Sequence, residues 1–113
     1  MRSADYAHRS TSLNDTQAEA GADGRLTYVL SNEDPGIRNW LDAGGLHDGL
    51  LLVRWELLPG AVQADKAVRE VRIVKLSSLG AALPAGITHV SAAQRQQWLL
   101  ERTQSYELRL ARQ

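Results

Sequence analysis

Four stretches of this chain have the periodicity of regular secondary structure, and together they enclose only a thin core. Three of them are strand-like: residues 25–31 and 49–59 place apolar side chains at alternate positions, and residues 68–76 alternate imperfectly, with a switch of phase. The fourth, residues 91–112, repeats apolar side chains at helical spacing. A few strands and one helix leave sheet edges uncovered, and proteins normally cover such edges. We therefore expect the chain to act as a homo-oligomer, most simply a dimer, or beside a larger protein partner.

The fold predicted from these segments is a single α+β domain. The links between the strands favour antiparallel pairing, so a small antiparallel β-sheet is followed by a C-terminal α-helix. We place this β-rich domain at residues 21–113, after a flexible or extended N-terminal segment of residues 1–20 without clear periodicity. The helix should cover about residues 91–112, and Ser91 and Gln94 match the capping box that begins many helices.

Turn residues separate these segments. Asp23 and Gly24 favour a tight turn before the first strand, because this pair tolerates the positive φ of hairpin turns. After that strand, Pro35 and Gly36 occupy the central positions of a type II turn, where glycine supplies the positive φ. Residues 77–84 predict a single helical turn that is stopped by proline.

Composition excludes several classes of function. The 13 basic and 13 acidic side chains balance, which argues against a nucleic-acid binder that neutralises phosphates. The sequence has no cysteine, so zinc–thiolate sites, disulfides and thiol nucleophiles are excluded. The longest apolar run, residues 50–53, is far too short to span a membrane, and residues 1–15 lack the apolar core of a secretory signal. We expect a cytoplasmic protein without a membrane span.

One loop concentrates small polar and aromatic residues and is the candidate for a small-ligand site. Its candidate residues are Asn39, Trp40, Asp42, His47 and Asp48. In a functional interpretation, Asp42, His47 and Asp48 converge on a metal or act in proton transfer, and Trp40 forms one wall of a pocket. In a structural interpretation, the asparagine and aspartates cap turns and Trp40 closes the end of the core. The residue types favour the structural interpretation, because their spacing matches no known metal motif.

Arg54 and Glu56 extend the candidate site along the next predicted strand. They are two residues apart, so their side chains point to the same face and could form the floor of a cleft. A cross-strand charge pair on a solvated face is the alternative. The sequence contains no phosphate-binding glycine loop, nucleophile elbow or paired-histidine motif. We therefore predict no catalytic residue, no metal site and no cofactor.

The joint spacing of several short motifs resembles the terminal region of an uncharacterised bacterial family of "domain of unknown function" proteins. In that family a strand is followed by D-x-P-G, N-W-L, a glycine turn and a strand ending in R-W. Here the matching elements are residues 26–30, 34–36, 39–41, 44–45 and 50–55, and the resemblance extends over about residues 12–102. It implies a β-sandwich or jelly-roll-like context at the end of a longer β-rich protein. The family has no settled activity, so no catalytic role is carried over.

Two functional hypotheses follow from these observations. The first is a non-enzymatic accessory or interaction module, a dimer or part of a larger assembly, that buries the apolar stripe around Trp98 or the second face of the strand around Trp55. The second is a small-ligand or carbohydrate-binding domain, or an enzyme subunit, with its site in the Trp40–Gly49 loop. The exposure of Trp40 distinguishes them, since a tryptophan that stacks on a sugar must be accessible.

Overall fold

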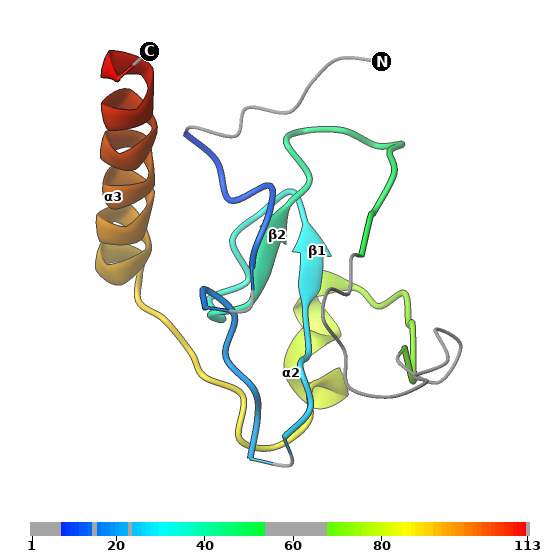
Figure 1. Cartoon of the computed structure of the whole chain (residues 1–113). Helices are drawn as coiled ribbons and strands as arrows, with labels where there is room; N and C mark the ends of the chain where they lie inside the picture. Colours follow the sequence, from blue (N-terminus) through cyan, green and yellow to red (C-terminus); the bar gives the residue numbers. More distant parts are fainter. Residues whose placement is uncertain (1–7, 15, 23, 54–67, 113) are drawn as a thin grey trace, which may run out of the picture. The chain divides into compact units, whose positions relative to one another are not determined.

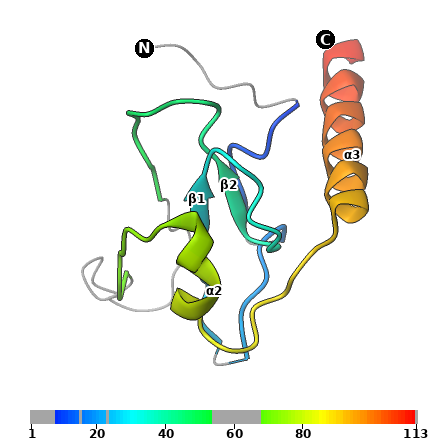
Figure 2. The same cartoon turned by 180° about the vertical axis from the view of Figure 1, so that it is seen from behind.

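The computed structural model describes residues 8–14, 16–22, 24–53 and 68–112. The chain divides into two units: the first unit is Met1–His47 with Pro84–Gln113, and the second unit is Asp48–Leu83. Among the described residues, two strands and one long helix belong to the first unit, and two short helices belong to the second. The regular elements, seen from opposite sides in Figure 1 and Figure 2, are β1 (Val29–Ser31), β2 (Trp40–Asp42), the 3₁₀ helix η1 (Leu76–Ser78), α2 (Leu79–Ala82) and α3 (Ala92–Ala111).

The two strands of the first unit lie side by side and run in the same direction (Figure 1). Val29 is level with Trp40, and Ser31 is level with Asp42. The backbone N–H of Val29 donates to the carbonyl of Asn39 at 2.9 Å, just before β2 begins. Parallel neighbours usually need a connection of about a dozen residues or more, so the short link over residues 32–39 is unusual.

The antiparallel sheet expected from the sequence is wrong. The described residues contain one parallel pair of short strands in a small α+β arrangement, with no antiparallel sheet and no sandwich or jelly roll. The reason lies in the link between the strands. After the positive φ of Gly36, residues 36–38 bond to residues 88–90, through Arg38 N–H to Thr88 O and Val90 N–H to Gly36 O, each 2.9 Å. The chain therefore turns twice before β2 and reaches it in the direction of β1.

The described parts of the second and third predicted strands do not form strands. Residues 49–53 and 68–75 have no regular secondary structure, and residues 54–59 of the second predicted strand lie outside the described residues. Alternation shows that a segment suits a half-buried sheet surface, but a strand also needs a partner backbone to bond. No described residue supplies that partner to residues 68–74.

The predicted helices are confirmed. The Ser91 side chain accepts a hydrogen bond from Gln94 N–H at 3.1 Å, and α3 then continues for five turns. The helical turn expected over residues 77–84 is formed by η1 and α2, and Pro84 follows their end. These elements depend on neighbours in the sequence, which is why local signals placed them well.

The interior of the first unit is small and largely polar. Its buried apolar residues are Ile37, which is 1% exposed, Trp40 and Ala18. Among the described residues, four polar or charged side chains are buried with them: Ser10, Asn39, Asp42 and Arg95. A buried polar group costs stability unless it is hydrogen-bonded, so the partners of these four groups decide how this unit holds together.

Candidate functional site

Arg95, from the first turns of α3, is the centre of the polar interior. Its side chain is 5% exposed and forms an ion pair with Asp34, with Nε 3.0 Å from Oδ2. Its Nη2 also donates to the carbonyl of Ile37, and its Nη1 is 3.5 Å from the carbonyl of Arg38. The guanidinium lies 5.0 Å from the centre of the Trp40 ring, within the range of a cation–π interaction.

This arrangement gives Arg95 a structural role inside the first unit. Arg95 is the buried residue of α3, and its five N–H donors serve an aspartate and two backbone carbonyls. Asp34 is itself tied into the turn before Ile37, because its Oδ1 accepts the Gly36 N–H at 2.8 Å. The arginine thus joins the start of α3 to the link between the strands, which is a structural role.

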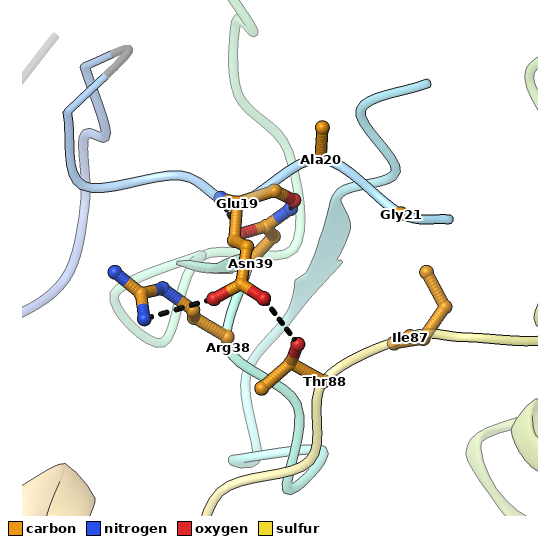
Figure 3. Close-up of a pocket in the computed structure, with 7 residues that line it drawn as sticks. All are labelled: Glu19, Ala20, Gly21, Arg38, Asn39, Ile87 and Thr88. Atoms are coloured by element: carbon orange, nitrogen blue, oxygen red, sulfur yellow. Dashed lines mark hydrogen bonds and ion pairs between the residues drawn. The ribbon is translucent and has the colours of Figure 1, made fainter. Parts of the chain in front are cut away.

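Glu19 makes a second polar connection, which Figure 3 shows in close-up. One carboxylate oxygen is 3.0 Å from Nη1 of Arg38, and the other accepts the hydroxyl of Thr88 at 2.8 Å. The hollow around these residues has a volume of about 10 Å³. That space is the size of a single water molecule, so this hollow cannot hold a substrate or cofactor.

Asn39, a predicted ligand-binding residue, is buried and uses its side chain within the chain. Its Oδ1 accepts the Glu19 N–H at 2.8 Å, and its Nδ2 donates to the carbonyls of Glu19, at 2.7 Å, and Thr27, at 3.1 Å. An amide side chain makes at most four such bonds, and three are used here. Asn39 therefore fastens two stretches of backbone and has little capacity left for a ligand.

Trp40 and Asp42, the next two predicted site residues, also face the interior. Trp40 is 6% exposed, and its Nε1–H donates to the carbonyl and hydroxyl of Ser31 at 3.1 and 3.0 Å. Asp42 accepts two hydrogen bonds from the Arg9 guanidinium, at 2.8 and 3.0 Å, and one from the Gly44 N–H at 2.8 Å. The exposed tryptophan that sugar stacking requires is thus not present at Trp40.

The other predicted site residues are not gathered with these three. His47 and Asp48 are both exposed, and they belong to different units of the chain. Arg54 and Glu56 lie outside the described residues. Within the described part of the chain, no group of three or more histidine, aspartate or glutamate side chains is arranged to hold a metal ion.

A groove lies between α3 and the N-terminal part of the first unit. Its volume is about 350 Å³, within the size range of ligand pockets. Its positive charges are already used: Arg38 pairs with Glu19, Arg95 pairs with Asp34, and Arg102 donates to the hydroxyl of Ser12 at 2.9 Å. The groove is therefore a poor site for an anion.

Trp98 lies in the wall of this groove, between two of its arginines. The guanidinium carbons of Arg38 and Arg95 lie 5.2 and 5.9 Å from the Trp98 ring centre, so both arginines pack against the ring. Trp98 was predicted to belong to an apolar stripe that a partner buries, and it is half-buried within the first unit. The signal that could have found this contact is the Arg95–Trp98 spacing, which places both side chains on one helix face.

The described residues of the second unit include many exposed apolar side chains. Leu50, Leu51, Leu52 and Val53 are all exposed in the first part of that unit. In the segment before η1, Val71 is 85% exposed and Ile73 is fully exposed, together with the less exposed Val68 and Val74. Consecutive exposed apolar residues of this kind mark interaction surfaces in soluble proteins. Residues 68–75, which we call the open segment, are the candidate functional site of this chain.

Comparison with known proteins does not identify a relative. No protein-family model, no curated protein and no solved structure matches this chain. The resemblance to a bacterial family of unknown function stays a prediction. None of the helices in the described residues has the length and apolar character needed to cross a bilayer.

Proposed function

We propose that this chain is a protein-interaction module that assembles with another polypeptide, either a second copy or a larger partner, through the open segment. The observation that carries the proposal is the exposure of Val71 and Ile73. Fully burying a valine or isoleucine side chain contributes about 1.5–3 kcal/mol. Covering two such residues in each of two strands supplies a driving force of the size that stable association requires.

The backbone of the open segment supports the same function. Residues 68–74 make no backbone hydrogen bond with any other described residue, and Lys75 accepts one from Ser78 at 2.9 Å. Backbone donors and acceptors that are not bonded within a chain can pair with another chain, as they do at the open edge of a sheet. Adding a strand to such an edge is a common mode of peptide recognition, in which main-chain bonds give affinity and alternate side chains give specificity.

Hydrogen exchange measured together with sedimentation tests this proposal. At concentrations where the chain sediments as a monomer, the amides of residues 68–74 should exchange quickly, and they should become protected as the chain associates. Replacement of Ile73 by glutamine should weaken association about tenfold or more. The matched control is Leu110→Gln, because Leu110 is also exposed but lies on α3 in the first unit. Slow exchange of these amides in the monomer would show that the segment is already covered, which contradicts the proposal.

A further inference from the structure

We infer that the open segment pairs in antiparallel fashion with the same segment of a second copy, about a two-fold axis at Val71. The inference rests on the proposed function and deepens it, because it names the partner and the register. It is carried by the order of charged and apolar side chains along residues 68–75. In a two-fold antiparallel pair, the residues at equal distances before and after the axis face each other across the strands.

Two charged side chains already lie on the same side of the open segment. Nε of Arg72 is 3.4 Å from a carboxylate oxygen of Glu70, and both side chains are more than half exposed. This contact between residues two positions apart is the geometry of an extended strand, in which alternate side chains share a face. The pair is therefore presented to the outside with its opposite charges side by side along the strand.

An axis at Val71 makes this face self-complementary. Glu70 of one copy lies opposite Arg72 of the other, and the same pairing recurs on the far side of the axis. At the next positions on the same face, Val68 lies opposite Val74. Opposite charges and branched apolar residues are favourable cross-strand pairs. Each interface would contain two ion pairs and two valine pairs on this face, all generated by one symmetry axis.

The other face of the paired strands gathers apolar residues at its centre. Val71 meets its own copy across the axis, and Ile73 lies opposite Arg69, whose aliphatic stem can cover it. Val71 and Ile73 are the most exposed apolar side chains of the open segment. The register that pairs the charges therefore also brings the exposed apolar residues of both copies together.

The neighbouring registers give less favourable cross-strand pairs. A parallel, in-register pair sets Glu70 against Glu70 and Arg72 against Arg72. An antiparallel axis at Glu70 or at Arg72 again places that residue opposite its own copy. An axis between Val71 and Arg72 puts each of them opposite the other, and Glu70 opposite Ile73. Like charges directly opposite destabilise a sheet, and charges opposite apolar residues leave the charges without partners.

A charge-reversal experiment in the whole chain tests this register. Glu70→Arg and Arg72→Glu should each weaken self-association about tenfold or more at low ionic strength, because each change turns both ion pairs into repulsions. An equimolar mixture of the two variants should form dimers at concentrations where each variant alone is a monomer. Within each variant the neighbours at 70 and 72 stay alike in charge, so recovery can come only from pairing between copies. A parallel pair of the two variants would recover as well, so the direction of pairing is decided by crosslinking.

Cysteine crosslinking gives a second test of the same axis. The chain has no cysteine of its own. Oxidation of Val71→Cys should give a disulfide-linked dimer, because an axis at this residue sets the two Cβ atoms within about 4.5–5.5 Å of each other. Arg69→Cys is the control on the same face, and it should crosslink more slowly because it faces position 73 of the other copy.

The outcomes separate the register from the proposed function. If the wild-type chain dimerises and Ile73→Gln weakens the dimer, but the charge-reversal mixture stays monomeric, the register is overturned and the interaction module stands. Crosslinking at Arg69→Cys that is as fast as at Val71→Cys also overturns the register. If the wild-type chain remains a monomer at all concentrations, pairing with a second copy is overturned. Slow exchange of the open segment in that monomer would overturn the proposed function as well.

Discussion

Replacement of Arg95 by methionine should destabilise the first unit strongly, although the change removes a charge from a buried position. Methionine keeps the unbranched apolar stem but loses every donor of the guanidinium. The carbonyls of Ile37 and Arg38 then lose their side-chain donor, and the carboxylate of Asp34 loses its cation. The Ile37 carbonyl is then left unmet, at a cost of about 1–3 kcal/mol, whereas the Arg38 carbonyl still accepts the Trp40 N–H at 3.0 Å.

The expected decrease in the free energy of unfolding follows from these lost contacts and from the partial exposure of Asp34. Removing one member of a buried ion pair costs about 3–5 kcal/mol when the other member stays dry. The Asp34 side chain is 34% exposed, so water can solvate part of its charge and the cost falls toward the lower end. Losing the contact between Arg95 and Trp40 adds about 0.5–1 kcal/mol. We expect the free energy of unfolding to fall by about 2–4 kcal/mol.

Urea unfolding followed by tryptophan fluorescence and by circular dichroism measures this loss. All variants should be compared at one protein concentration, since association adds to apparent stability. Arg112→Met is the matched control, because Arg112 is exposed at the C-terminal end of α3 and should change stability by less than about 0.5 kcal/mol. If Arg95→Met and Arg112→Met unfold at the same urea concentration, Arg95 does not hold α3 to the link between the strands.

Two further substitutions test the polar interior and the helix cap. Asn39→Ala should lower the free energy of unfolding by about 2–4 kcal/mol, because the backbone groups of Glu19 and Thr27 lose their hydrogen-bond partner. A thermal midpoint within about 2 °C of the wild-type value would contradict this prediction. Ser91→Ala should cost about 1 kcal/mol by removing the side-chain acceptor at the start of α3. Circular dichroism measures the helix content, and Ser105→Ala within the same helix is the control. If both variants lose the same helix content, the capping role of Ser91 is refuted.

Elements that depend on near neighbours in the sequence were predicted well, and features that depend on distant contacts were not. Helix α3 and its cap at Ser91 were predicted closely, because both depend on residues within a few positions of each other. The positive φ at Gly36 was also predicted from its immediate neighbours. The direction of β2 was not predicted. It depends on hydrogen bonds between residues 36–38 and residues 88–90, which no local sequence pattern encodes.

The candidate loop shows the same limit at the level of side chains. The sequence left this loop either as a ligand site or as a structural end of the core, with Asn39 and Asp42 as caps of nearby turns and Trp40 as a plug. It could not show that Asn39 reaches back to Glu19, or that Asp42 pairs with Arg9, since these partners are distant in the sequence. A buried structural residue and a binding residue have the same chemistry, and only the location of their partners separates them.

By itself, the amino-acid sequence determined where this chain forms helix, where it turns, and which segments suit a half-buried strand. Those properties arise from backbone sterics and from contacts between near neighbours. The tertiary structure decided that Arg95 is buried, that the two strands run parallel, and that the open segment has no strand partner among the described residues. Each of these features depends on which groups distant in the sequence meet in space. The neighbours in space decide whether a polar or apolar side chain lies in the interior or on the surface.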